Sequence, residues 1–198
     1  MRVVLLALGA NRQGPWGTPA ETLRRALWAL FAAGIEPRAV SGLYLTAPEG
    51  PAAQSDFHNA VISVRTNLPP AGLMRALKGL EAQAGRRMGR RWAPRPLDID
   101  ILADPGVHLG WSRRKRVATR GGSRAQPSQA QVLPRSLVIP HPRLHQRAFV
   151  LVPLLDIAPR WQHPVLKCGA RALLRRLGPQ RRTVRRIAKR WADHRWSL

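Results

Sequence analysis

Apolar and polar residues follow each other along the chain in patterns that predict strands and helices in turn. Residues 2–8, RVVLLAL, form a nearly continuous apolar run that ends at a glycine, which predicts a buried strand. A helix is predicted next, because Thr18 suits the N-cap, Pro19 suits the first turn and Glu21 completes a capping box. Apolar residues then recur at helical spacing as far as Gly34, where the helix should end.

The pattern further along predicts more strands and a second helix. Residues 39–47, AVSGLYLTA, and 57–66, FHNAVISVRT, are rich in β-formers and flank a loop with Pro and Gly. A helix is predicted over residues 69–85, and short strands over PLDIDIL at 96–102 and SLVIP at 136–140. Strands alternating with two helices, without solenoid repeats, predict a single α/β sandwich built on one sheet.

Two stretches depart from this rhythm. Residues 103–135 are rich in Gly, Ser, Gln, Pro and Arg and have no sustained apolar period, so we expect a basic, mobile insertion. Residues 183–196, TVRRIAKRWADHRW, have the spacing of a short basic amphipathic helix. We therefore predict a main domain over residues 1–177 and a basic C-terminal tail over 178–198.

The amino-acid composition indicates an anionic partner and a cellular compartment. The chain of 198 residues has 34 Lys and Arg against 10 Asp and Glu, a formal charge of +24. Such an excess indicates nucleic acid, a membrane surface or phosphorylated small molecules. The single cysteine, Cys168, cannot form an internal disulfide, and the N-terminal apolar run is too short for a membrane span. A cytoplasmic protein is expected.

The segment RWAPRPLDIDIL, residues 91–102, places two of the few carboxylates beside several arginines. In a strand, Asp98 and Asp100 share one face while the leucine and isoleucines between them face the core, so the two Cβ atoms lie roughly 6–7 Å apart. Such a pair can hold one or two Mg²⁺ ions that take their other ligands from water and phosphates. Alternatively, both aspartates lie on a solvated face and pair with Arg91 or Arg95.

Other segments offer partners for an anion or a flat ring. The spacing of His141 and His145 resembles a zinc motif, but the prolines on both sides of His141 argue against the helix it needs. His141 and Arg147 can contact phosphate, or they can cap turns; the residues alone leave both open. Phe57 and Asn59 share a strand face and can form a pocket wall for a heterocycle, or Phe57 can belong to the core.

Six short motifs follow one another along the chain. They are GAN, Y-x-T-x-P-x-G, Q-x-x-F-x-N-A-V, E-x-x-x-G-R, R-W-x-P-R-x-L-D-I-D-I-L and I-P-H-P-R-x-x-x-R-x-F-V-L-x-P-L. Taken together and in this order, they resemble the 6-hydroxymethyl-7,8-dihydropterin pyrophosphokinases of folate synthesis. The resemblance runs from about residue 3 to residue 164, interrupted by the insertion. It implies a ferredoxin-like α+β sandwich with a mainly antiparallel sheet flanked by helices.

The resemblance also implies an activity, 2-amino-4-hydroxy-6-hydroxymethyldihydropteridine diphosphokinase, which transfers pyrophosphate from ATP to the pterin hydroxymethyl group and releases AMP. By this resemblance Asp98 and Asp100 hold two Mg²⁺ ions, and Arg86 and Arg95 match catalytic-loop arginines. His141 and Arg147, together with Arg95, match contacts to ATP. The positions that match pterin contacts are Thr46, Pro48, Phe57, Asn59 and Phe149.

The chain departs from the family pattern at a few positions. Ala10 stands where the family commonly has Ser, Ala93 stands where it commonly has Gly, and the arginine loop GRRMGRRW is one residue shorter. A rival hypothesis is a nucleic-acid-binding protein that uses the basic insertion and tail. A weaker one places the tail on anionic membranes. We expect a monomer whose main partners are the two small substrates.

Overall fold

The computed structural model describes residues 1–48, 54–87, 93–111 and 137–192, and it contains eight strands. These are β1 (Arg2–Ala10), β2 (Glu36–Val40), β3 (Leu43–Thr46), β4 (Phe57–Thr66), β5 (Asp98–Ala103), β6 (Gln162–His163), β7 (Cys168–Gly169) and β8 (Arg185–Ala188). The α-helices are α1 (Pro19–Ala32), α2 (Pro70–Gln83), α4 (Ala148–Ile157) and α5 (Ala170–Arg176). Two 3₁₀ turns are η1 (Leu144–Gln146) and η2 (Gly178–Thr183).

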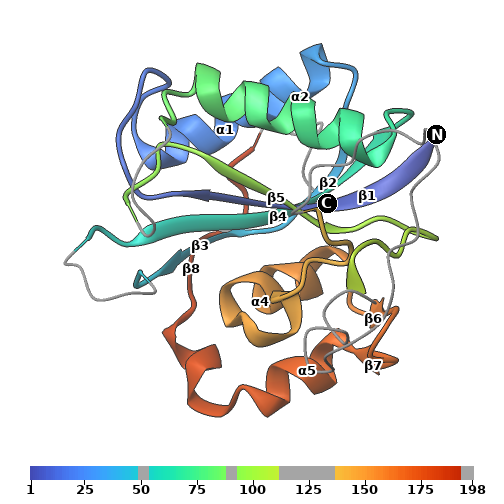
Figure 1. The fold of residues 1–198 in the computed structure, drawn as a ribbon. Coiled ribbons are helices and arrows are strands. Elements are labelled where there is room, and N and C mark those ends of the chain that lie inside the picture. Colours follow the sequence, from blue (N-terminus) through green and yellow to red (C-terminus); the bar gives the residue numbers. More distant parts are fainter. Residues whose placement is uncertain (49–53, 88–92, 112–136, 193–198) are drawn as a thin grey trace, which may run out of the picture.

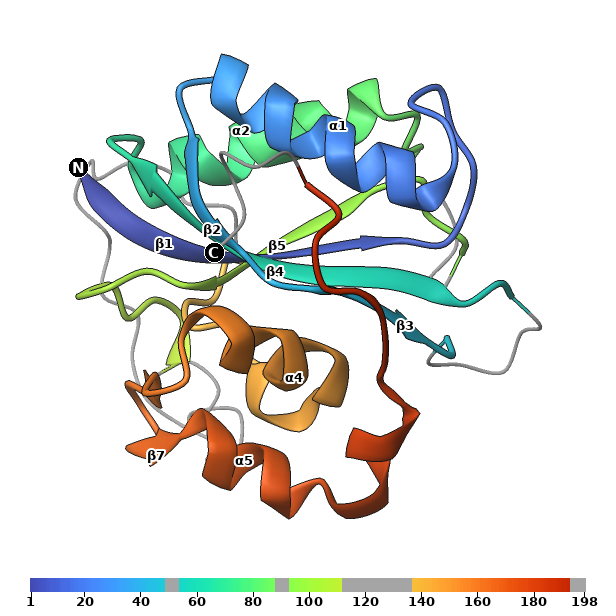
Figure 2. The ribbon, with the colours of Figure 1, turned by 180° about the vertical axis from the view of Figure 1, so that it is seen from behind.

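Most strands form one sheet with helices on both faces. The sheet has the order β5-β1-β4-β3-β8, with β2 pairing along β4 beside β3, and every one of these pairs is antiparallel. Helices α1 and α2 cover one face, and α4 and α5 lie on the other (Figures 1 and 2). The predicted α+β sandwich with a mainly antiparallel sheet is confirmed.

The first helix forms where its capping signals predicted it. The Thr18 hydroxyl accepts from the backbone N–H of Glu21, whose side chain in turn accepts from the backbone N–H of Thr18. This reciprocal cap satisfies two amides that the helix leaves without partners, and a cap of this kind contributes about 1 kcal/mol. Gly34 follows the helix with a φ of +71°, a conformation that favours glycine, so the predicted end is confirmed.

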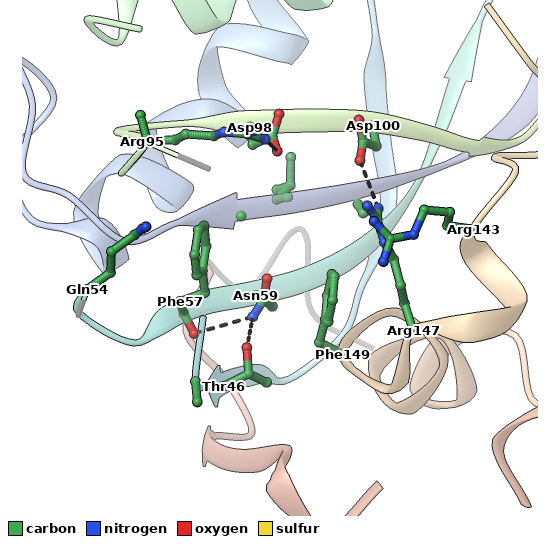
Figure 3. Close-up of a pocket in the computed structure, with 15 residues that line it drawn as sticks. Thr46, Gln54, Phe57, Asn59, Arg95, Asp98, Asp100, Arg143, Arg147 and Phe149 are labelled. Carbon is green, nitrogen blue, oxygen red and sulfur yellow. Dashed lines mark hydrogen bonds and ion pairs between the residues drawn. The ribbon is translucent and has the colours of Figure 1, made fainter. Parts of the chain in front are cut away.

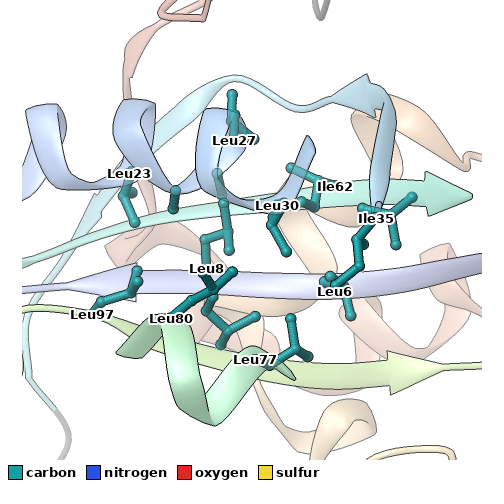
Figure 4. Packing of buried hydrophobic residues seen from close by; sticks show 14 of the residues in the cluster. Leu6, Leu8, Leu23, Leu27, Leu30, Ile35, Ile62, Leu77, Leu80 and Leu97 are labelled. Carbon is teal, nitrogen blue, oxygen red and sulfur yellow. The ribbon is translucent and has the colours of Figure 1, made fainter. Parts of the chain in front are cut away.

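The α1 and α2 face carries the larger of two apolar clusters. Alternate residues of the strands point up between the helices, and the helices contribute one stripe each (Figure 4). A second, smaller cluster lies under the other face, where Val61 and Leu102 pack against Leu151 and Leu154 of α4. That second cluster covers only part of its face, which leaves the strand ends near β5 and β4 for other side chains.

The strand predicted over residues 39–47 is two strands with a break. At Ser41 the backbone N–H still donates to Val61, but the return bond goes from the Val61 N–H to the Ser41 hydroxyl at 3.0 Å. The side chain therefore replaces a ladder carbonyl, and the chain shifts before β3 begins. Gly42 follows, and a Cβ built there would lie 3.0 Å from the carbonyl oxygen of Ala188 on β8.

The predictions for the C-terminal half need correction. The helix predicted over residues 183–196 is wrong, because Arg185–Ala188 forms β8 against β3, and residues 193–198 lie outside the described part of the chain. Helices α4 and α5 were not predicted. The strand predicted at 136–140 is a single bridge between Ile139 and Leu109 in the described part of the chain.

The predicted insertion falls mostly on residues 112–136, which lie outside the described residues. Its first part is described and lies against the fold: Arg2 donates to Asp104, and the indole N–H of Trp111 donates to the carbonyl oxygen of Pro140 at 2.7 Å. The boundary at residue 177 stays a prediction. No described helix has both the length and the apolar content needed to span a bilayer.

Candidate active site

A cavity of about 260 Å³ opens on the α4 face of the sheet, beside the smaller apolar cluster. Strands β1, β3, β4 and β5 form its floor, and the start of α4 forms one wall (Figure 3). Charged side chains gather at the β5 end, and neutral ones gather at the β3 end. Among its lining residues are Thr46, Gln54, Phe57, Asn59, Arg95, Asp98, Asp100, Arg143, Arg147 and Phe149.

Strand alternation places the two aspartates at the charged end. Leu97, Ile99 and Ile101 are at most 3% exposed and pack in the larger core. Asp98 and Asp100, which alternate with them, turn to the opposite face and line the cavity (Figure 3). The prediction that both carboxylates point to one place is confirmed.

Asp98 lies between two guanidinium groups. Arg86 contacts one of its carboxylate oxygens, and Arg95 contacts the other. Burial raises the pKa of Asp98, but the charges of Arg86 and Arg95 outweigh burial, so the pKa lies below its ordinary value. The carboxylate is therefore ionised at neutral pH and ready to meet a cation.

Glu81 forms an ion pair with Arg86, and it was not predicted as a site residue. Its side chain is 2% exposed, accepts the backbone N–H of Ile99 at 2.8 Å, and lies 2.7 Å from both Lys78 and Arg86. Burial raises the pKa of Glu81, and the two cations oppose that effect. Arg86 thus bridges a buried carboxylate and a cavity carboxylate, and this bridge fixes its guanidinium beside the cavity without making it a lining residue.

Asp100 faces two basic side chains from the segment before α4, at longer distances. Nη1 of Arg147 lies 3.4 Å from its carboxylate, and Nε2 of His141 lies 3.7 Å away. Nδ1 of His141 accepts the backbone N–H of Arg143 at 3.2 Å, so Nε2 carries the ring proton and directs it toward Asp100. Burial lowers the pKa of His141, although Asp100 opposes this.

The neutral end is a slot between two aromatic rings. Phe57 comes from β4 and Phe149 from the first turn of α4, and the amide of Asn59 lies between them in the view of Figure 3. The Asn59 amide donates to the Thr46 hydroxyl at 2.8 Å. A Cβ at Gly9 would lie 3.3 Å from Asn59 Oδ1, so this glycine leaves room for the amide. The slot suits a flat ring with polar edges.

Two further residues, both inside the quoted motifs, support the site without having been predicted. The Asn11 side chain accepts the backbone N–H of Arg95 at 2.8 Å and donates to Gln54 at 3.1 Å. It therefore joins the arginine loop to the loop before β4. Arg143 also lines the cavity, and so does Ala93.

Eight of the predicted site residues line the cavity, and they come from four segments of the chain. They are Thr46, Phe57, Asn59, Arg95, Asp98, Asp100, Arg147 and Phe149. Arg86 and His141 lie one contact behind them through Asp98 and Asp100. Pro48, a described residue, is half-buried outside the cavity lining and next to the undescribed residues 49–53. Most of the arginine loop, residues 88–92, lies outside the described chain as well.

The donor set at the charged end fits a hard cation. Within the described residues, no group of three or more His, Cys, Asp or Glu side chains is placed to hold a metal. Two carboxylates on one face suit Mg²⁺, which binds through one or two carboxylates and completes its shell with water and phosphate oxygens. Zinc requires more protein ligands than this site supplies.

The fold and the residues of this site suit an enzyme that transfers a phosphate-containing group to a small acceptor. The whole segment that builds the site matches a family model. That model is described as 7,8-dihydro-6-hydroxymethylpterin-pyrophosphokinase (HPPK), and it matches residues 5–159. The chain belongs to this family, whose members transfer pyrophosphate from ATP to hydroxymethyldihydropterin in folate synthesis.

Curated relatives carry the same description. The chain is 39% identical over 155 residues to the 2-amino-4-hydroxy-6-hydroxymethyldihydropteridine pyrophosphokinase of Methylorubrum extorquens, covering 78% of this chain and 81% of the relative. It is 39% identical over 163 residues to the Pseudomonas aeruginosa enzyme of that name, covering 81% and 83%. The enzyme activity predicted from the motifs is confirmed, with ATP as co-substrate.

Solved structures support the fold. The HPPK-DHPS of Plasmodium falciparum, solved with SDX-DHP, aligns with a TM-score of 0.61 at 16% identity, covering 94% of this chain. A second HPPK-DHPS, in complex with substrates, gives a TM-score of 0.63 at 17% identity. This chain spans about half of each of those proteins, 47% and 48%. At such identity the likeness concerns the architecture alone.

Proposed function

We propose that the cavity divides the two substrates between its two ends, with ATP phosphates at the charged end and the pterin ring at the neutral end. The observation that carries this proposal is the pairing of each cavity aspartate with cations at one end of a slot between two phenylalanines. Carboxylates that contact arginines now can release them to phosphate oxygens when a metal binds. The two ends then meet near Gly9, where the acceptor hydroxymethyl group approaches the phosphates.

At the charged end, Asp98 and Asp100 would hold two Mg²⁺ ions. When bound, these ions neutralise charge on the ATP phosphates, which is the chief demand of phosphoryl-type transfer. Arg86 and Arg95 would contact the transferred pyrophosphate, because both guanidinium groups already lie against Asp98. His141 and Arg147 would contact ATP phosphates from the α4 side. The pterin hydroxymethyl oxygen would attack the β-phosphorus, and AMP would leave.

At the neutral end, Phe57 and Phe149 would stack on the two faces of the pterin. The amide of Asn59 would bond its edge, together with the hydroxyl of Thr46 and the backbone near Pro48. Asn59 already donates to Thr46, so the amide is oriented before a ligand arrives.

AMP release from Mg-ATP, with and without 6-hydroxymethyl-7,8-dihydropterin, tests the proposal. We expect pterin-dependent AMP from the wild-type protein and a loss of about a thousandfold or more in Asp98→Ala. The matched control is Glu36→Ala. It removes a carboxylate of β2 that pairs with Arg65 of β4, away from the cavity. Normal turnover in Asp98→Ala, or an equal loss in the control, would contradict the metal assignment.

We further propose a cytoplasmic monomer. A single mass near 22.1 kDa in sedimentation would agree with it, and a dimer would not. The rival reading as a nucleic-acid-binding protein finds no support in the relatives named above. Contact of the basic tail with nucleic acid or anionic membranes stays a secondary prediction, and a binding titration at moderate salt that finds no affinity would end it.

A further inference from the structure

The segment after the family match carries a strand, β8, that pairs with β3 at the neutral end of the cavity. The match ends at residue 159, and residues 160–192 contain many Arg and Lys residues but no Asp or Glu. All of their basic side chains are exposed, and that of Arg186 is 44% exposed. Arg186 nevertheless contacts both Tyr44 and Asp156. One solvent-exposed arginine of this segment is therefore bonded to two residues of the family-matched fold.

The pairing of the strands places Arg186 in the same row as the cavity floor. Across the sheet, Asp98 pairs with Gly9, Gly9 with Asn59, Asn59 with Tyr44, and Tyr44 with Arg186. Residues opposite each other in antiparallel strands have side chains on the same face. Tyr44 and Arg186 thus continue the face that holds Asp98 and Asn59, and Tyr44 is the immediate neighbour of the proposed pterin-binding amide.

Tyr44, Asp156 and Arg186 form a closed polar cluster at the end of that row. The Tyr44 hydroxyl donates to Asp156 Oδ2 at 2.7 Å, and it accepts from Nε and Nη2 of Arg186 at 2.9 and 2.6 Å. The guanidinium also contacts the other oxygen of Asp156 and lies 5.2 Å from the centre of the tyrosine ring. Tyr44 is 3% exposed, and burial raises its pKa to about 12, so it stays a donor.

This cluster joins the helix that carries Phe149 to β3, the strand that carries Thr46. Asp156 lies on α4, two helical turns after Phe149, and its carboxylate also accepts the backbone N–H of Gly42 just before β3 at 3.0 Å. Thr46 stands at the other end of β3. One carboxylate therefore fixes the helix that carries Phe149 against the strand that carries Thr46.

The C-terminal segment is held firmly enough to serve as this clamp. After β8 the chain crosses the edge of the sheet to the α1 face (Figure 2). There Trp191 is 6% exposed in the larger core, and its indole N–H donates to the carbonyl oxygen of Ser41 at 2.8 Å. The backbone of Trp191 accepts from Arg24 of α1 at 3.0 Å. Arg186 is thus tied at one side to β3 and at the other to the core.

We propose that Arg186, acting through Tyr44 and Asp156, is a positioning residue that sets the width of the pterin slot. The inference rests on the proposed binding of pterin between Phe57 and Phe149. It assigns no contact with substrate to Arg186. Among the described residues, Asp98 contacts Arg86 and Arg95 between α2 and β5. Asp100 contacts His141 and Arg147 just before α4, so neither aspartate contacts this cluster. Loss of Arg186 should therefore affect pterin far more than ATP.

Equilibrium binding of pterin and of Mg-ATP to Arg186→Gln tests the proposal. We expect the Kd for pterin to rise about tenfold (~1.4 kcal/mol) while the Kd for ATP changes less than twofold. The matched control is Arg185→Gln, which removes the same charge from an exposed neighbour that alternates to the other face of β8. Equal losses of both ligands, or the same shift in the control, would overturn the proposal.

A second variant separates positioning from folding and from charge. Tyr44→Phe keeps the buried ring but removes the hydroxyl that joins the cluster. If Arg186 acts through Tyr44, the double variant Tyr44→Phe/Arg186→Gln should bind pterin as tightly as whichever single variant has the higher Kd. The reason is that both changes break the same set of contacts. Additive losses would overturn the proposal. Thermal unfolding of each variant gives the folded fraction by which both Kd values are corrected.

Phe149→Ala distinguishes failure of this inference from failure of the proposed function. If Phe149→Ala weakens pterin binding and Arg186→Gln does not, the slot is assigned correctly and only the positioning role falls. If Phe149→Ala leaves pterin binding unchanged, the slot itself is wrongly assigned and the inference falls with it.

Discussion

The two ends of the cavity are held in different ways. At the charged end, the side chains that contact Asp98 and Asp100 in the described part of the chain are three arginines and His141, all of which can contact a substrate phosphate in turn. At the neutral end, Asn59 is fixed by Thr46, whose own strand is fixed through Tyr44 and Asp156. The charged end is thus arranged to exchange partners on binding, whereas the neutral end is preformed. An enzyme that must admit a flexible triphosphate but select one small ring benefits from both.

The two ends also differ in how far apart their residues lie in the sequence. Most of the charged end comes from a short stretch that includes Glu81, Arg86, Arg95 and the two aspartates of β5, so local contacts assemble it. The neutral end needs β3, β4, α4 and β8, which are far apart in the chain. Because the proposed metal and phosphate contacts lie at the charged end and the proposed ring contacts at the neutral end, mutations at the charged end should act mainly on chemistry, and mutations at the neutral end on ligand selection.

The largest expected effect comes from Asp100→Asn measured beside Asp98→Asn. Both should lower pterin-dependent AMP release about a thousandfold or more, because each replaces an anionic oxygen that a cation needs. Pterin affinity should change little in either, as measured by equilibrium titration without nucleotide. A comparable loss of pterin affinity would break the distinction between the two ends.

The next effect concerns the aromatic walls. Phe57→Ala should weaken pterin binding about ten- to a hundredfold, in line with ~1–3 kcal/mol for a lost ring stacking contact. The Kd for Mg-ATP should stay within twofold. Leu166→Ala, which truncates an apolar side chain that is 40% exposed outside the cavity, is the control. Equal weakening of both ligands would return Phe57 to a purely structural role.

The smallest effect is on stability against pH, and it concerns the charged end alone. The pKa of Asp98 is lowered on folding, so it contributes stability above its ordinary value of 3.8 that is lost as pH falls through its folded pKa. The pKa of Glu81 is raised, so its ionisation costs stability as pH rises from 4.5 through its folded pKa.

Urea unfolding between pH 3 and 7 separates these two carboxylates. Glu81→Gln should remove the decrease in unfolding free energy that occurs as pH rises above 4.5. Asp98→Asn should remove the decrease in unfolding free energy that occurs as pH falls below 3.8. Both changes should alter the shape of the stability profile against pH, and a Thr46→Val variant at the neutral end should leave that shape unchanged. A profile that is the same in wild type and Glu81→Gln would mean that Lys78 and Arg86 fully offset the burial of Glu81.

Alternation and capping made much of the fold predictable. Thr18 and Glu21 gave the start of α1, and the period of two in LDIDI placed both aspartates on one face. Helix α4 was missed because AFVLVPLLDI is apolar nearly all round and includes Pro153, so periodicity does not separate a buried helix from a strand there. β8 was missed because four residues of a basic segment carry too weak a strand pattern.

The site was predictable where residues belong to motifs and not where burial decides. Phe57, Asn59 and the aspartates stand in the motifs and line the cavity. Glu81 begins one of those motifs, yet nothing in the letters shows that its carboxylate is buried against the backbone of Ile99. Arg186 has no motif at all, and only its pairing with Tyr44 across two distant strands distinguishes it from its neighbours.

β8 has one more consequence, for solubility. Without it, β3 would be the edge of the sheet, and its outward backbone N–H and C=O groups would be open to a strand of another molecule. Pairing with β8 satisfies these groups within the chain and places arginines along the new edge. A chain that ended after the family-matched region would expose the unpaired backbone of β3 next to the active site. Self-association through this strand would then compete with substrate binding.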